Sequence, residues 1–161
     1  MKKEKMNDKG FSLVELIIVI AIMAVLVVVL APQYLKYVER SRNSSDISNA
    51  TAMATALQVY AADPDADHPF KKGNVITITV TASGSATASS VTTTGTGADA
   101  DAGKDALEQA AITIGDVHCK SKTNWTTYTI TATVKSDGSL EFVYSSDSSE
   151  SPDAFEAAMT K

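Results

Sequence analysis

The chain has 161 residues, a length that suits one domain together with a long helix. Its formal net charge is −5; the first ten residues carry +2, which leaves −7 (−5 minus +2) for residues 11–161. Such an acidic chain lacks the clustered lysine and arginine side chains of a nucleic-acid-binding surface, so we expect no nucleic acid on it. The single cysteine, Cys119, excludes an intrachain disulfide.

The chain begins with a short basic leader, residues 1–10, which is followed by a long apolar run. Residues 16–31 contain no polar side chain, and the stretch from Phe11 to Ala31 is 21 residues long. As a helix it spans roughly 31 Å at 1.5 Å per residue, close to the hydrocarbon thickness of a bilayer. We therefore predict a transmembrane helix over residues 11–32.

Glu15 is a carboxylate near the start of this apolar helix. A charged group costs about 3 kcal/mol at the centre of a membrane helix, and less near its end, so it indicates a functional site with a partner. No basic residue lies between Lys9 and Lys36. A cut between Gly10 and Phe11 would create an amine on Phe11, which a second copy of the chain would present to Glu15. We therefore predict that Glu15 is a self-assembly residue.

The leader ends in Lys9-Gly10, and Phe11-Ser12-Leu13-Val14-Glu15-Leu16 follows. This pattern, with the apolar helix behind it, resembles the class III signal of type IV pilins and of type II secretion pseudopilins. The resemblance covers residues 1 to about 60. It implies that a prepilin peptidase cuts after Gly10 and methylates the amine of Phe11, and that Glu15 and Pro32 act in assembly. Many Gram-negative members close a C-terminal loop with a disulfide, and this chain departs from that pattern.

Beyond Pro32, the periodicity predicts that the helix continues as an amphipathic segment over residues 33–62. Apolar side chains recur there at three- and four-residue steps: Leu35, Val38, Ile47, Ala50, Ala54, Leu57 and Ala61. Charged residues, including Glu39 and Asp46, lie between these positions. Asp63-Pro64 ends the helix, because proline disfavours the helical conformation in the residue before it.

Residues 63–161 are expected to form a globular head that contains an antiparallel sheet. Apolar and polar residues alternate over 75–81 and 125–134, as in strands with one buried face. Asp137-Gly138 is a hairpin turn signal that precedes a third strand at 140–144. The expected fold class is α+β, the pilin fold, in which the long helix packs against a small antiparallel sheet.

The remaining segments of the head are expected to be loops and short helices. Residues 82–104 are almost wholly Ala, Ser, Thr, Gly and Asp, which predicts an exposed loop without core residues. Residues 145–152 read as a second polar loop. Short helices are expected at 105–111 and 152–159.

Three carboxylates, Asp63, Asp65 and Asp67, are spaced as in the first half of a calcium-binding loop. His68 stands in the place of the required glycine, and Asn74 stands in the place of the glutamate at the twelfth position. These departures favour a polar turn at the end of the helix, so no metal ion and no other cofactor is expected.

His118 and Cys119 are adjacent in the sequence, but two ligands do not make a zinc site. A catalytic Cys–His pair also needs a third, orienting group and a pocket, which the sequence does not indicate. The chain contains no glycine-rich phosphate loop and no nucleophile elbow. We therefore expect that this protein is not an enzyme.

The residues and the resemblance together predict a structural subunit of a type IV pilus, which acts in adhesion and motility. Before assembly the chain would cross the cytoplasmic membrane once, with its N-terminus inside because the lysines precede the span; afterwards it would lie in the cell-surface pilus. The expected partners are further copies in a helical filament, the prepilin peptidase, the pilus assembly platform and the membrane.

Two other functions stay open at the level of the sequence. The first is a pseudopilin of a type II secretion or competence system, which builds a short filament for secretion or DNA uptake. The second is a monomeric, membrane-anchored surface binding protein whose leader is never removed. The mature N-terminus distinguishes the second from both filament subunits.

Overall fold

The computed structural model describes residues 11–149 and 153–160. The predictions for Gly10 and for the leader therefore lie outside the described residues. The chain divides into two compact units, one that ends at Val38 and one that begins at Glu39. We describe each unit by itself, and the division at residues 10, 32 and 62 stays a prediction.

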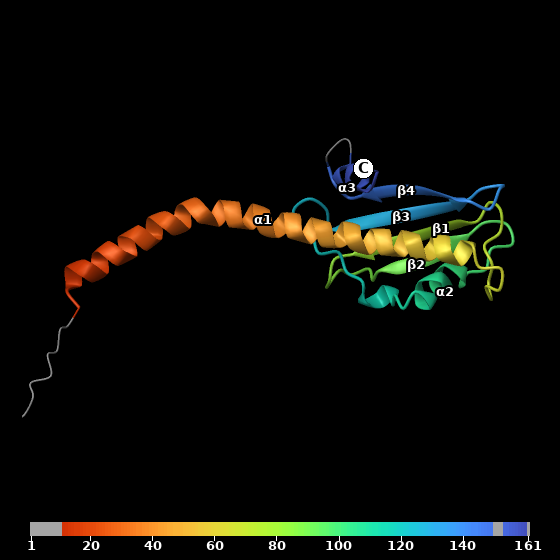
Figure 1. The fold of residues 1–161 in the computed structure, drawn as a ribbon, viewed down its shortest axis with the longest axis horizontal. Helices are drawn as coiled ribbons and strands as arrows, with labels where there is room; N and C mark the ends of the chain where they lie inside the picture. Colours follow the sequence, from red (N-terminus) through yellow and green to blue (C-terminus); the bar gives the residue numbers. More distant parts are fainter. Residues whose placement is uncertain (1–10, 150–152, 161) are drawn as a thin grey trace, which may run out of the picture. The chain divides into compact units, whose positions relative to one another are not determined.

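A single long helix, α1, spans Leu13–Ala61 and contains Pro32 (Figure 1). Proline inside a helix removes one backbone hydrogen bond and bends the helix rather than always ending it. The helix ends at Ala61, next to the predicted stop at Asp63-Pro64. The prediction that the helix passes through the proline is confirmed.

The first unit contains the N-terminal part of α1, up to Val38, and no described residue covers it. Every residue from Phe11 to Tyr37 is exposed. The run is long and apolar enough to cross a membrane by its length and composition. An apolar surface of this size needs a nonpolar environment, because exposing it to water is unfavourable.

The second unit contains one antiparallel sheet of four strands in the order β2-β1-β3-β4 (Figure 1). The strands are β1 (Val75–Thr81), β2 (Ser90–Thr94), β3 (Thr127–Val134) and β4 (Leu140–Ser146). The central pair, β1 and β3, places Ile78 opposite Ile130. The predicted alternation is confirmed, since the apolar side chains of both strands are buried: Ile76, Ile78, Val80, Tyr128, Ile130, Ala132 and Val134. The chain thus has an α+β fold, with a long apolar N-terminal helix and a small antiparallel sheet.

The core of this unit lies between the sheet and the C-terminal part of α1. Met53 and Leu57 of the helix are 1% and 0% exposed and belong to the same apolar cluster as the sheet residues. Three aromatic side chains of the cluster pack against one another. The ring of Phe155 lies 4.6 Å from the ring of Tyr128 and 5.4 Å from that of Trp125, measured between centroids.

Three short helical elements complete the head: α2 (Ala102–Gln109), the 3-10 turn η1 (Ile114–Asp116) and α3 (Ala154–Met159). The α3 helix is the predicted C-terminal helix, and the Asp153 side chain caps it by accepting a hydrogen bond from the Phe155 amide at 2.9 Å. The α2 helix begins three residues before the predicted helix at 105–111.

The prediction of an exposed loop over residues 82–104 is wrong in its second half. The segment contains β2, which pairs with β1, and the first residues of α2. Threonine favours strands, and Thr93 is buried on the core face of the sheet. Ala102 is fully buried because a small side chain lets α2 approach the sheet closely. The composition correctly indicated a polar segment. It did not indicate that small side chains such as Ala102 allow α2 to pack closely against the sheet.

The predicted apolar stripe of the long helix is correct only after residue 46. Leu35 is 66% exposed, whereas Ala50 and Leu57 are fully buried. Two carboxylates that were read as lying beside the stripe, Glu39 and Asp46, are 8% and 0% exposed. Their burial is the main unexpected feature of the head.

Candidate functional site: the carboxylates of the long helix

Glu15 lies on the first turn of α1 and accepts a hydrogen bond from the Ser12 amide, at 2.9 Å from N to Oε2. The sequence Ser12-Leu13-Val14-Glu15 has the spacing of a capping box, in which the glutamate at the third helical position reaches back to the residue before the helix. The structure therefore gives Glu15 a role within its own chain. The sequence contained the signal for this cap, and our prediction did not use it.

The other predicted assembly residues lie on the same exposed helix. Phe11 precedes the helix and is 85% exposed. Pro32 lies inside the helix, and the residues around it are exposed as well. Within one chain, no described hydrogen bond joins any two of the three residues Phe11, Glu15 and Pro32. Their proposed roles in processing and assembly concern other molecules.

Asp46 anchors the segment between η1 and β3. Its Oδ1 accepts a hydrogen bond from the Lys120 amide at 2.7 Å, and its Oδ2 accepts from the Ser121 amide at 2.9 Å. The same Oδ2 accepts from the indole Nε1 of Trp125 at 3.1 Å and from the Cys119 thiol at 3.3 Å. One buried carboxylate thus organises four donors.

Glu39 holds the next part of the same segment. Its Oε1 accepts from the Ser121 hydroxyl and the Lys122 amide, both at 2.7 Å, and from the Thr123 amide at 2.9 Å. Its Oε2 accepts from Arg42 at 3.3 Å. Burial by itself would raise the pKa of Glu39, but these hydrogen bonds outweigh burial and lower the pKa to about 2.

Residues 119–125, which we call the anchored segment, are therefore tied to α1 through two carboxylates. The sequence did contain a signal for this arrangement. Glu39 and Asp46 are seven residues apart and continue the spacing of Ala50, Met53 and Leu57, so they lie on the buried face of the helix. Acidic residues at core positions indicate a partner, and the partners here are mostly backbone amides of the anchored segment.

Cys119 belongs to this arrangement and not to a catalytic pair. It is 6% exposed, and burial, followed by the charge of Asp46, raises the pKa of its thiol to about 12. A protonated, buried thiol is a poor nucleophile and a poor metal ligand. The Nδ1 atom of the neighbouring His118 is buried without a hydrogen-bond partner among the described residues.

The acidic turn after α1 forms ordinary polar contacts. Asp63 accepts hydrogen bonds from the Asp65 amide at 3.0 Å and from Gln109 at 3.2 Å. His68 pairs through Nδ1 with Asp105, and its Nε2 lies 3.7 Å from Asp99, so it is not isolated. The hydrogen bond to Asp105 is the largest cause that raises the pKa of His68. Within residues 11–149 and 153–160, no group of three or more His, Cys, Asp or Glu side chains is arranged to hold a metal ion.

Comparison with protein families identifies the start of the chain. The family model of the prokaryotic N-terminal methylation motif matches residues 5–31. These residues contain the predicted cleavage position and the first part of the apolar helix. No solved structure matches the chain.

Several curated proteins are similar to part of the chain. The type IV major fimbrial protein FimA of Dichelobacter nodosus is 41% identical over 59 residues, which are 37% of this chain and 38% of that protein. The type IV major pilin protein PilA of Myxococcus xanthus is 34% identical over 59 residues, 37% of this chain and 27% of PilA. A fimbrial protein of Pseudomonas aeruginosa is 40% identical over 51 residues, 32% of this chain and 33% of that protein.

The chain therefore spans less than two-fifths of the length of these relatives. Their names are those of fimbrial and pilin proteins, and none of them describes an enzyme. The N-terminal part of the chain thus carries the prokaryotic N-terminal methylation motif, and about a third of the chain is similar to type IV fimbrial and pilin proteins.

Proposed function

We propose that this protein is a structural subunit of a type IV pilus that is cut after Gly10, methylated on Phe11 and assembled into a helical filament. The observation that supports this most is the first half of α1, an apolar helix that is exposed along its whole length and carries Glu15 on its first turn. A helix of this kind requires a nonpolar environment, which the membrane supplies first and a bundle of identical helices supplies afterwards.

The prepilin peptidase is the proposed processing partner, and the pilus assembly platform is the proposed partner for extraction from the membrane. Before assembly the chain would cross the cytoplasmic membrane with its N-terminus inside, because the leader is rich in lysine. In the pilus, the unit from Glu39 onward would form the outer surface, which meets other cells and solid supports.

Glu15 is the proposed contact between subunits. Its hydrogen bond to the Ser12 amide satisfies one carboxylate oxygen, and no cation among residues 11–149 and 153–160 forms an ion pair with it. Burying that charge among apolar helices is costly unless a positive group pairs with it. The amine of Phe11 on a neighbouring subunit is that group. A contact between two different surfaces of identical subunits does not close on itself, and so it produces a filament.

The names of the relatives favour a pilus over the two alternatives. The relatives described above are fimbrial or pilin proteins, and a short secretion filament or a monomeric anchor has no comparable support. A monomeric anchor would also leave the Glu15 charge without a partner.

The test compares two substitutions of Glu15 that separate its charge from its role as a cap. Glu15→Gln keeps a side chain that can close the capping box but removes the charge, whereas Glu15→Val removes both. We expect both variants to be inserted and cleaved after Gly10, and both to lose normal filaments. Mass spectrometry of the mature N-terminus and electron microscopy of surface filaments measure the two steps separately.

The outcomes of this test are distinct. Normal filaments from Glu15→Gln would contradict the charge pairing and leave only the cap. An N-terminus that still begins at Met1 in wild-type cells with an active prepilin peptidase would contradict processing and favour the monomeric anchor.

A further inference from the structure

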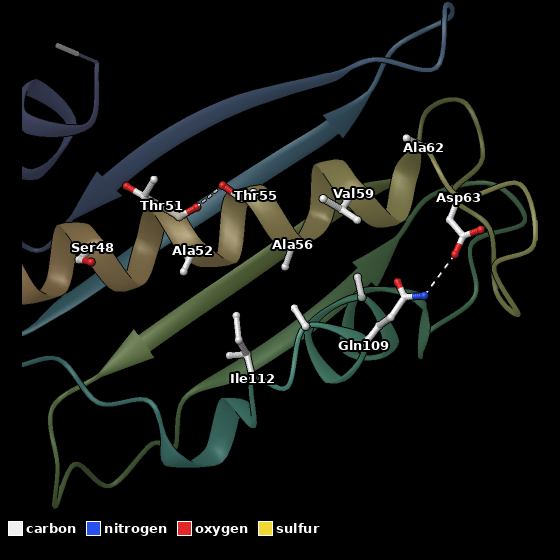
Figure 2. A pocket seen from close by; sticks show the side chains of 12 residues that line it. Ser48, Thr51, Ala52, Thr55, Ala56, Val59, Ala62, Asp63, Gln109 and Ile112 are labelled. Atoms are coloured by element: carbon white, nitrogen blue, oxygen red, sulfur yellow. Dashed lines mark hydrogen bonds between the residues drawn. The ribbon is translucent and has the colours of Figure 1, made fainter.

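The head carries a groove of about 1070 Å³ between α1 and α2 (Figure 2). One face of α1 forms one side, with Thr51, Ala52, Thr55 and Val59, and Ala110 and Ile112 lie on the other side. The groove lies entirely within the unit that begins at Glu39. Most of its lining side chains are small, so a second helix can approach α1 closely and place larger side chains in the groove.

The groove is more apolar than its composition indicates. The hydroxyl of Thr51 donates to the Ile47 carbonyl at 2.8 Å. The hydroxyl of Thr55 donates to the Thr51 carbonyl at 2.8 Å, a bond that Figure 2 shows. Because both hydroxyls are satisfied within their own helix, binding an apolar side chain beside them leaves neither hydroxyl without a partner. Val59 is 62% exposed.

A set of large, exposed side chains lies elsewhere on α1. Leu30, Tyr34 and Tyr37 are at positions i, i+4 and i+7 of α1, so they form one ridge. They are 59%, 67% and 72% exposed, and no described residue covers them. The two tyrosines follow the apolar span, where aromatic rings with a polar tip are suited to a partly wet protein contact.

The ridge and the groove lie on separate stretches of α1, 30–37 and 48–59. Both belong to one helix, in which a side chain contacts positions three or four residues away, and Tyr37 lies 14 residues before Thr51. The charges next to the two surfaces are also complementary. Arg40, three residues after Tyr37, is exposed, and Asp63 lines the end of the groove, where its Oδ2 accepts from Gln109 at 3.2 Å (Figure 2).

We propose that this groove receives Leu30, Tyr34 and Tyr37 of a second copy of the chain, with Arg40 of that copy beside Asp63. Matching residue 40 to residue 63 offsets two parallel helices by 23 positions, about 35 Å along their axis. The contact joins two different surfaces, so each copy has one ridge and one groove left for further copies. This inference rests on the proposed function, because it identifies which surface of the next subunit meets the helix in the filament.

The first test uses a photoreactive aromatic residue. Benzoylphenylalanine in place of Tyr37 keeps an aromatic side chain on the ridge, and in place of Lys36 it puts the same group about 100° around the helix, off the ridge. In intact filaments, we expect light to join position 37 to groove residues of another copy, such as Val59, and position 36 to other sites. Mass spectrometry of the cross-linked peptides identifies the attachment points.

The second test fills the groove. Ala52 is exposed within one chain, so Ala52→Phe should fold, but its ring would occupy the space for the ridge. We expect a roughly tenfold or greater loss of filament yield, the size expected for overpacking a contact. Gln58→Phe is the matched control, because Gln58 is exposed on α1 outside the groove. It should assemble normally.

The results separate this inference from the proposed function. Filaments with cross-links from position 37 to another surface, to lipid or to a different protein would overturn the docking in this groove and leave the pilus subunit in place. Normal filaments from Ala52→Phe would overturn it as well. A wild-type chain that stays uncut and forms no filaments would instead overturn the proposed function.

Discussion

At the scale of single residues, the carboxylate of Asp46 gives the clearest case of a structural role that the sequence pattern concealed. A buried carboxylate is unfavourable by itself, because it has lost its hydration. Here its two oxygens accept from Lys120, Ser121, Trp125 and Cys119, and hydrogen bonds to a charged acceptor are stronger than those between neutral groups. The four donors offset the loss of water and fix the path of the anchored segment.

We therefore expect Asp46→Ala to destabilise the head by about 3 kcal/mol or more, since several buried donors lose their acceptor. Asp46→Asn should destabilise the head less, because its amide oxygen still accepts a hydrogen bond. Some loss remains, because its NH₂ group cannot accept and would face hydrogen-bond donors. Urea unfolding of the detergent-solubilised chain, followed by Trp125 fluorescence, measures both. The chain has one tryptophan, so the signal reports this site. The exposed Asp65→Ala is the control; equal stability of Asp46→Ala and this control would contradict the role of the anchor.

At the scale of secondary-structure elements, the elements with a clear hydrophobic pattern in the sequence were predicted, and those without one were missed. The alternation in β1 and β3, and the long apolar run of α1, identify their elements because one face or the whole surface is apolar. Strand β2 has no such pattern: it is Ser-Val-Thr-Thr-Thr, and only its pairing with β1 makes it a strand. Its position depends on contacts between distant residues, which no local window contains.

The same dependence on close packing appears where α2 meets the sheet. A Cβ atom on Gly103 would lie 2.8 Å from Cγ2 of Ile76 and 2.9 Å from Oγ1 of Thr93. Alanine is favoured over glycine inside a helix by about 1 kcal/mol. The clash should outweigh that gain, because overpacking a buried contact costs about 1–3 kcal/mol.

We therefore expect Gly103→Ala to lower the free energy of unfolding. The matched control is Gly115→Ala, whose new Cβ would have nothing within 4 Å. It should leave stability unchanged or slightly raised. Thermal unfolding monitored by circular dichroism compares the two variants, and a Gly103→Ala protein at least as stable as Gly115→Ala would show that α2 adjusts without cost.

At the scale of the whole molecule, the residues that raise the membrane and filament hypotheses are contiguous in the sequence, whereas those that hold the head together are far apart. The Gly10-Phe11 junction and Glu15 lie in a contiguous motif, so the sequence alone raises the hypothesis of cleavage and assembly. The anchored segment joins residues 39 and 46 to residues 119–125, more than 70 positions away in the chain. Such a site becomes visible only when the fold brings the segments together.

The stability of the head in acid should depend on Glu39. Its pKa in the folded chain is about 2, below the ordinary value of 4.5, because the hydrogen bonds from Ser121, Thr123, Lys122 and Arg42 outweigh its burial. A lowered pKa in the folded state stabilises the protein fully above pH 4.5, and this contribution is lost as the pH falls from 4.5 toward 2.

We expect Glu39→Gln to be less stable than the wild type at neutral pH and to lose less stability between pH 4.5 and 2. Urea unfolding at several pH values in this range, followed by Trp125 fluorescence, measures the difference. Parallel curves for the two proteins would mean that Glu39 titrates with an ordinary pKa in the folded chain.

The contacts that hold the anchored segment also determine under which redox conditions the head can fold. Its attachment uses two carboxylates and a thiol that remains reduced, so closing it consumes no oxidant and calls for no thiol-exchange enzyme. Dithiothreitol should therefore leave the head intact, and newly exported subunits should reach their final form equally well in oxygen-free surroundings.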